Sequence, residues 1–269
     1  MEPARAFPAL AWRQGRYETA SRNLAAEAAV AISYNGTSHA VLMASPADLE
    51  DLALGFSISE GIATRDEVEA VDVLADDRGF DVQVRLATDA ESRLAARRRA
   101  MAGPVGCGMC GLESIDAALR EPPRVDATAR LRPGDVAEAC AALTRAQALN
   151  QSTRSVHGSG YYVAGRGLVA IREDVGRHNA LDKLVGAMAR AGGMGEGAVV
   201  TSSRVSIELI QKTAASGCGI LIAVSAPTLL AVEMAERAGI TLAAIARGDE
   251  FEIFTHPDRI KEGALPHVA

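Results

Sequence analysis

Two closely spaced cysteines, Cys107 and Cys110, are the residues whose types and spacing most directly suggest chemistry. They form a Cys-Gly-Met-Cys sequence with further glycines at positions 106 and 111. The thiolate is the reactive form of cysteine, and positive charge, helix N-terminal amides or a second thiol at this spacing favour it. One cysteine can attack a donor persulfide and hold the added sulfur, while the second assists its release or forms a disulfide. We therefore expect a sulfur-carrying pair on a glycine-rich, mobile loop.

Zinc binding is the main alternative, because a C-x-x-C pair is also half of a common zinc site. Completing the site would require His157, His178 or His256, none of which has the usual short spacing to a second ligand. The H-x-E motif of zinc deaminases is missing from the sequence, and no buried strand precedes the pair as in thioredoxin-like enzymes. Spacing therefore favours thiol chemistry, and we expect no structural metal. Cys140, on an apolar helical face, and Cys218, at the start of a buried strand, are expected to be inert core thiols.

A second candidate site follows from the short buried strands of the C-terminal half. Strands at 198–201, 220–224 and 241–246 alternate with helices at 205–215 and 229–238. This order predicts a parallel sheet, in which ligands bind outside the carboxyl ends of the strands. Hydroxyls, helix N-terminal amides and two arginines would meet there and suit phosphate oxygens. Turn and helix-cap duties are the simpler alternative for these residues. The residues concerned are Ser202, Arg204, Ser225, Thr228 and Arg247.

A dense run of charges, Arg172–Lys183, leads from a strand into a helix beside this predicted edge. Such charges are costly to bury unless they are paired or used on a ligand. Two interpretations of this run are open. It is either a solvated helix start with internal ion pairs or a functional segment.

The elements that position these residues form two units. Residues 28–86 have the pattern of a small α+β unit, with a hairpin turn at Asn35-Gly36 and a strand near residues 82–86. Between them, Ser45 is expected to cap a helix that begins with Pro46 and stops at Gly61. A connection at 87–130 leads to the second unit, so we expect domains at 1–129 and 130–269.

Composition restricts the function classes further. The 269 residues are 48% hydrophobic and carry a formal net charge of −6, so no basic excess indicates a nucleic-acid partner. The N-terminus lacks the apolar core of a signal peptide, and no apolar run is long enough to span a bilayer. With only four cysteines, a secreted disulfide framework is not indicated. We expect a cytoplasmic protein without membrane association.

Several segments together resemble the formate dehydrogenase accessory sulfurtransferase family, often called FdhD. The matching segments lie in order along the chain. They are 43–62 (MASPADLEDLALGFSISEGI), 107–111 (CGMCG), 172–184 (REDVGRHNALDKL), 201–212 (TSSRVSIELIQK), 224–228 (VSAPT) and 246–256 (ARGDEFEIFTH).

The resemblance implies a sulfur carrier that serves formate dehydrogenase. It would receive sulfane sulfur from a cysteine desulfurase as a persulfide on Cys107, with Cys110 as companion. It would pass the sulfur to its bound substrate, the molybdenum cofactor Mo-bis-molybdopterin guanine dinucleotide, which GDP or a related guanine nucleotide would mimic. The family also implies a homodimer and an α/β fold, in which an α+β unit precedes a three-layer α/β/α domain with a mainly parallel sheet, similar to cytidine deaminase.

The resemblance also places the cofactor on particular residues of this chain. Its guanine-dinucleotide segment maps to Ile245, Ala246, Arg247, Gly248, Asp249, Glu250 and Phe251. Arg247, Arg204 and helix N-terminal amides would bind diphosphates, and Asp174 or His178 would orient the pterin or guanine. Two rival functions are a zinc-stabilised cofactor chaperone without sulfur transfer and, by fold analogy, a nucleotide hydrolase.

Overall fold

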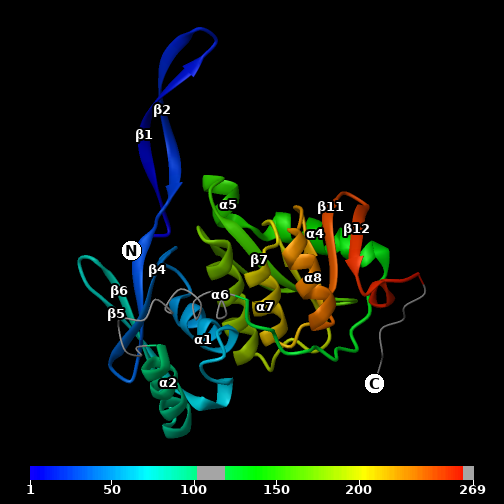
Figure 1. Cartoon of the computed structure of the whole chain (residues 1–269). Helices are drawn as coiled ribbons and strands as arrows, with labels where there is room; N and C mark the ends of the chain where they lie inside the picture. The colour runs from blue at the N-terminus through cyan, green and yellow to red at the C-terminus, as the bar shows by residue number, and fades with distance from the viewer. Residues whose placement is uncertain (102–118, 263–269) are drawn as a thin grey trace.

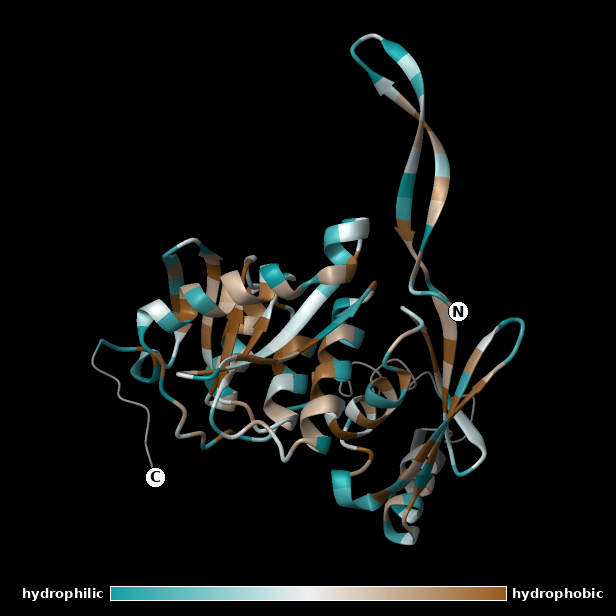
Figure 2. Ribbon diagram, turned by 180° about the vertical axis from the view of Figure 1, so that it is seen from behind, coloured by the Kyte–Doolittle hydropathy of each residue, from teal (hydrophilic) through white to brown (hydrophobic). Residues whose placement is uncertain are grey.

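The computed structural model describes residues 1–101 and 119–262 (Figure 1). The chain begins with a long two-stranded hairpin, β1 (Ala4–Arg13) and β2 (Arg16–Ala25), which projects away from the rest of the molecule. Its turn uses Gln14 and Gly15 in the left-handed region, with φ of 48° and 82°. Figure 2 shows both hydrophobic and hydrophilic stretches along this ribbon. No pattern in the sequence analysis predicted it, and Pro8 within β1 argues against a strand there.

A four-stranded sheet follows, in the order β4-β3-β6-β5. The predicted Asn35-Gly36 hairpin is confirmed, since both residues have positive φ between β3 and β4. The predicted strand near residues 82–86 is β6, whose Val82, Val84 and Leu86 are buried. A helix, α2, occupies the start of the predicted connection. The bounds are β3 Ala28–Tyr34, β4 Thr37–Ala44, β5 Val68–Ala75, β6 Gly79–Leu86 and α2 Thr88–Met101.

The helix of this unit, α1 (Leu49–Ser59), begins later than predicted. The expectation that Ser45 caps it is wrong, because its N-cap is Asp48 in the left-handed region, with φ of 54°. Ser45 is engaged elsewhere: its hydroxyl accepts the N–H of Val175 at 3.1 Å. A contact between residues 130 positions apart therefore overrides the local capping pattern. Gly61 ends the helix as predicted, with φ of 65°.

The second sheet has six strands in the order β12-β11-β10-β9-β7-β8. Parallel pairing is confined to β9, β10 and β11, while β7, β8 and β12 pair antiparallel. The α/β class is confirmed. The sheet, expected to be mainly parallel, is mixed, with two parallel and three antiparallel strand pairs. The strands are β7 His157–Val163, β8 Gly167–Asp174, β9 Ala198–Thr201, β10 Ile220–Ala223, β11 Thr241–Arg247 and β12 Glu250–Thr255.

Helices cover both faces of this sheet and so form three layers. One core cluster joins α6, α7 and α8 to strand residues such as Val199 and Leu221. The other joins α4 to the alternate strand residues Val200 and Ile222. A short helix, α5, leads from α4 into β7. The bounds are α4 Pro133–Ala146, α5 Ala148–Thr153, α6 Arg177–Arg190, α7 Ile207–Ala215 and α8 Leu229–Ala238.

The two units are tightly joined, because α1 packs along α6 (Figure 1). Residues before position 130 also contact the second unit: the N–H of Val125 donates to Ala238 O, at the end of α8, at 2.8 Å. The boundary at 129 and 130 stays a prediction. Within the part of the chain that is described, no helix has the length and apolarity needed to cross a membrane.

Candidate functional site

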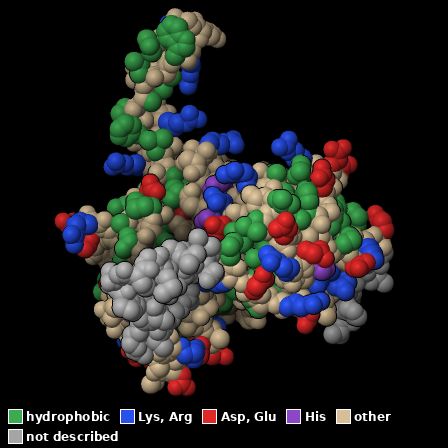
Figure 3. All heavy atoms as spheres, in the orientation of Figure 1, with side chains coloured by type: hydrophobic (Ala, Val, Ile, Leu, Met, Phe, Trp, Pro, Cys, Tyr) green, Lys and Arg blue, Asp and Glu red, His purple; other side chains and the backbone are tan. Residues whose placement is uncertain are grey.

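The carboxyl ends of β9, β10 and β11 meet at one edge of the six-stranded sheet, as the sequence predicted. Because β7 runs antiparallel to β9, and β8 antiparallel to β7, the start of β7 and the end of β8 lie at the same edge. The edge therefore also carries His157 and the turn that leads into α6. In Figure 3, basic side chains and histidines lie together near the centre of the visible face.

Two of the predicted hydroxyls at this edge are used to hold loops together. The hydroxyl of Ser202 accepts the N–H of Gly158 at 2.9 Å, and that of Thr228 accepts the N–H of Ala231 at 3.3 Å and caps α8. The simpler interpretation of these two residues, turn and cap duties, therefore accounts for their hydroxyls. The side chain of Arg204 is exposed between them, on the loop that leads into α7.

The predicted guanine-dinucleotide segment divides into supporting and exposed residues. Ala246 is buried, and Phe251 packs against the core cluster that contains α4. Four residues at the turn between β11 and β12 are exposed. They are Arg247, Gly248, Asp249 and Glu250.

A strained residue starts this segment. Ile245 has φ of 56°, a conformation that is unusual for a β-branched side chain and costs on the order of 1–3 kcal/mol. The pairing of β11 with β12 shifts register between Ala244 and Arg247. The N–H of Ile245 donates to Ser225 O at 3.3 Å and ties this turn to the loop after β10. Such strain recurs at ligand-binding sites.

Asp174, predicted to orient a heterocycle, is placed differently from the other candidates. Its side chain is fully buried and lies 2.6 Å from Nζ of the equally buried Lys183. Its carboxylate also accepts the N–H groups of Ser45 and Gly176 and the amide of Asn179. Asp174 thus shapes the turn before α6 from inside and does not face the edge surface.

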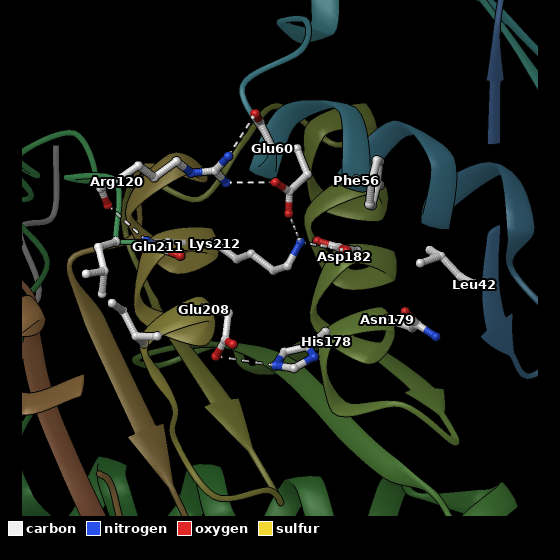
Figure 4. Close-up of a pocket in the computed structure, with 12 residues that line it drawn as sticks. Leu42, Phe56, Glu60, Arg120, His178, Asn179, Asp182, Glu208, Gln211 and Lys212 are labelled. Atoms are coloured by element: carbon white, nitrogen blue, oxygen red, sulfur yellow. Dashed lines mark hydrogen bonds and ion pairs between the residues drawn. The ribbon is translucent and has the colours of Figure 1, made fainter. Parts of the chain in front are cut away.

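His178 instead lines a cavity of about 390 Å³ between α1, α6 and α7 (Figure 4). Its Nε2 lies 3.8 Å from Glu208 on α7. Burial lowers the pKa of His178, and the positive charge of Arg177 lowers it further. The imidazole is therefore neutral at pH 7 and can accept or donate one hydrogen bond.

The carboxylate of Glu208 offers acceptor oxygens beside this imidazole. Burial opposes its charge, but the neighbouring Ser206 hydroxyl and its own amide dipole lower its pKa on balance. The wall on the opposite side is apolar, with Leu42 and Phe56. A polar edge facing an apolar wall suits a flat heterocycle.

A buried cation forms the upper part of the same cavity. Nζ of Lys212 lies 2.9 Å from both Asp182 and Glu60, and it donates to Ser59 Oγ at 3.0 Å. Arg120 pairs with Glu60 at 2.9 Å and is one of the first described residues after position 118. This network, visible in Figure 4, joins both units and the segment that follows the Cys-Gly-Met-Cys sequence.

The predicted sulfur-carrying residues, Cys107 and Cys110, lie outside the described residues. The other two cysteines are buried as predicted. Burial raises the pKa of Cys140 to about 11 and also raises that of Cys218, which disfavours their thiolates. Within residues 1–101 and 119–262, no three His, Cys, Asp or Glu side chains are grouped as metal ligands.

Two residues at the edge, Arg177 and His157, were not among the ligand contacts predicted from the sequence. Nε of Arg177, the first residue of α6, is buried without a hydrogen-bond partner among the described residues. His157 was considered only as a zinc ligand, yet it lies at the same edge. The charge density of residues 172–183 was the available signal for Arg177.

Comparison with known proteins agrees with this architecture. A chain from Desulfotalea psychrophila, described as a candidate formate dehydrogenase accessory protein, superposes with a TM-score of 0.77 at 25% identity, over 96% of this chain and all of its own. A relative from Agrobacterium fabrum named "Sulfur carrier protein FdhD" is 54% identical, with 93% of each chain covered. One of the same name from Cupriavidus necator is 45% identical, over 96% of this chain and 90% of its own. The sequence model of the FdhD/NarQ family matches residues 25–261, and the chain therefore belongs to that family.

Proposed function

We propose that this chain is a sulfur carrier for the maturation of formate dehydrogenase, with Cys107 as the carrying residue. The observation that carries the proposal is the identity of 43–54% to relatives named sulfur carrier protein, over most of the chain. The Cys-Gly-Met-Cys sequence supplies the chemistry such a carrier needs. A cysteine desulfurase, formate dehydrogenase and a second copy of the chain are the proposed partners.

The loading step is a thiol–persulfide exchange. The Cys107 thiolate attacks the outer sulfur of the desulfurase persulfide, the old S–S bond breaks, and the desulfurase leaves as a thiolate. The product is a persulfide on Cys107. Delivery as sulfide needs two electrons, which the pair supplies when Cys110 attacks Sγ of Cys107, expels hydrosulfide and forms a disulfide. A thiol reductant then restores both thiols.

The proposed acceptor is the guanine-dinucleotide molybdenum cofactor, bound as substrate at the sheet edge. The exposed turn with Arg247 and the exposed Arg204 offer positive charge for its diphosphates. The first turn of α6 has no side-chain cap and no acidic residue, so backbone N–H groups are available for anions there. These features fit the acidic groups of such a cofactor.

The cavity between the units is the proposed place for a heterocycle of this substrate. Guanine and pterin each present neighbouring N–H donors, which match the carboxylate of Glu208. The neutral His178 can bond the adjacent edge, while Leu42 and Phe56 cover the ring face. GDP serves as the test ligand for this binding.

Intact-mass analysis after incubation with a cysteine desulfurase and cysteine tests the carrier role. We expect a mass gain of one sulfur atom that thiol reductant removes, and no gain in Cys107→Ala. Cys110→Ala should still gain the sulfur but release it slowly. Stoichiometric zinc bound through both cysteines, without sulfur gain, would instead support the zinc-stabilised chaperone.

A further inference from the structure

Two arginines at the sheet edge, Arg177 and Arg204, act on His157 and form a basic cluster with it. This residue begins β7, and its neighbour Gly158 exchanges bonds with Ser202: the Gly158 N–H donates to Ser202 Oγ at 2.9 Å, and the Ser202 N–H to Gly158 O at 3.0 Å. These bonds hold the loop that carries Arg204 beside His157. On the other side, His157 pairs in register with Asp174 of β8, three residues before Arg177.

Positive charge outweighs negative charge in this cluster. Glu208 of α7 acts on Arg177, but it is shared with His178. Arg177, Arg204 and Asp174 are the described charged groups that act on His157. Of these, Asp174 is negative, but its carboxylate is already paired with the buried Lys183. Arg177 Nε has no hydrogen-bond partner within the described chain although it is shielded from water. Positive groups held together in this way repel one another unless an anion joins them.

We propose that Arg177, Arg204 and His157 together bind a diphosphate group, with His157 becoming the third cation when the anion is present. Two guanidinium groups give a multiply charged anion the donors it prefers, in planar pairs. This inference rests on the proposed function, because a guanine dinucleotide supplies the diphosphate.

Proton uptake by His157 distinguishes this site from a general basic surface. In the free protein, burial lowers the pKa of His157, and Arg177 and Arg204 lower it further. A bound diphosphate neutralises the two guanidinium groups and adds negative charge, so the pKa of His157 should rise on binding. An anion bound elsewhere on the surface, beyond the screening distance, would leave the pKa of His157 nearly unchanged.

The first experiment is a titration of the full-length protein with pyrophosphate. Arg177→Gln and Arg204→Gln should each weaken its binding by about 10- to 100-fold, the loss typical of one charge-assisted hydrogen bond. Arg166→Gln is the matched control, because Arg166 lies in the β7–β8 turn at the opposite end of the same strands. Guanosine, which lacks phosphate, should bind wild type and Arg177→Gln equally.

The second experiment follows the His157 ring by NMR across pH, with and without pyrophosphate, using His157→Gln for assignment. A rise in its pKa on binding supports the site. An unchanged pKa, or wild-type affinity in both arginine variants, overturns it. Sulfur loading of Cys107 is measured in the same variants. Loading that persists while pyrophosphate binding fails refutes only this site, whereas absent loading in the wild type refutes the carrier function.

Discussion

Gly55 of α1 and Gly186 of α6 allow the two helices to approach until each meets the other's backbone. A Cβ on Gly55 would lie 1.7 Å from the carbonyl oxygen of Asp182, and one on Gly186 would lie 2.0 Å from that of Asp51. No side chain fits at either position unless the helices separate. Because α1 and α6 belong to different units and both line the cavity of Figure 4, this contact sets the width of the candidate site.

Gly186→Ala should therefore destabilise the protein by about 1–3 kcal/mol or more, since the new methyl group meets backbone that cannot rotate away. Urea unfolding measures the loss. Gly134→Ala is the control, because Gly134 lies in the first turn of α4 with nothing within 4 Å of its added Cβ. The control should match or slightly exceed wild-type stability. Equal stability of both variants would show that the helices do not cross this closely.

Lys183→Met should cost about 3–5 kcal/mol, because it leaves the buried carboxylate of Asp174 without its cation. A double variant that also carries Asp174→Leu should regain part of the loss, since it removes the isolated charge. Lys261→Met is the control: Lys261 pairs with Asp258, but both side chains are exposed. Its effect should stay below about 1 kcal/mol in the same unfolding assay. A loss below about 1 kcal/mol for Lys183→Met would contradict the burial of Lys183.

The sequence predicted those parts of the fold that are governed by local patterns. The helix at Leu229–Ala238 has the predicted bounds, and the strand at Ala198–Thr201 does too. Short buried strands alternating with helices leave few arrangements, so the edge at which the strand ends meet followed from chain order alone. The predicted positions of Arg204 and Arg247 at that edge depend only on this order.

Long-range contacts explain what the sequence could not predict. The charges of residues 172–183 are neither solvated nor all available to a ligand, because partners from distant elements bury several of them. Lys183 contacts the carbonyl oxygen of Ser45 at 2.9 Å, and Asp182 accepts a bond from Ser59 at 2.6 Å. No periodicity within one segment encodes a partner more than a hundred residues away. Another long-range contact, from the Val175 N–H to the Ser45 hydroxyl, displaced the predicted cap of α1.

Stability should fall as the pH drops below about 6.5, because two half-buried histidines resist protonation in the native state. The pKa values of His157 and His178 are lowered from the ordinary 6.5, chiefly by burial and then by Arg177. The unfolded chain therefore binds more protons below pH 6.5, and the native state loses stability there until each folded pKa is passed. Unfolding midpoints between pH 7.5 and 5, in steps of about half a unit, measure this dependence.

A variant with His157→Gln and His178→Gln should show a flatter profile over this range. Carboxylates with a lowered pKa affect stability only under more acidic conditions. Glu67 is an example, because hydrogen bonds from Thr64 and Arg93 lower its pKa to about 2. The two effects are therefore separated on the pH axis. An unchanged slope in the double variant would place the responsible protons on other groups.

Thiol labelling should separate the four cysteines into two reactive and two protected ones. Cys140 and Cys218 are buried, and burial raises the pKa of both thiols, so alkylation of their thiolates in the native protein should be slow. A variant with Cys107→Ala and Cys110→Ala should thus resist iodoacetamide at pH 8 and take up two labels in urea, as counted by intact mass. Rapid native labelling of this variant would show that the core opens on the time scale of alkylation. If Cys140 and Cys218 are protected, they cannot reach a desulfurase. Any sulfur gained by the wild type is then carried by the Cys-Gly-Met-Cys sequence.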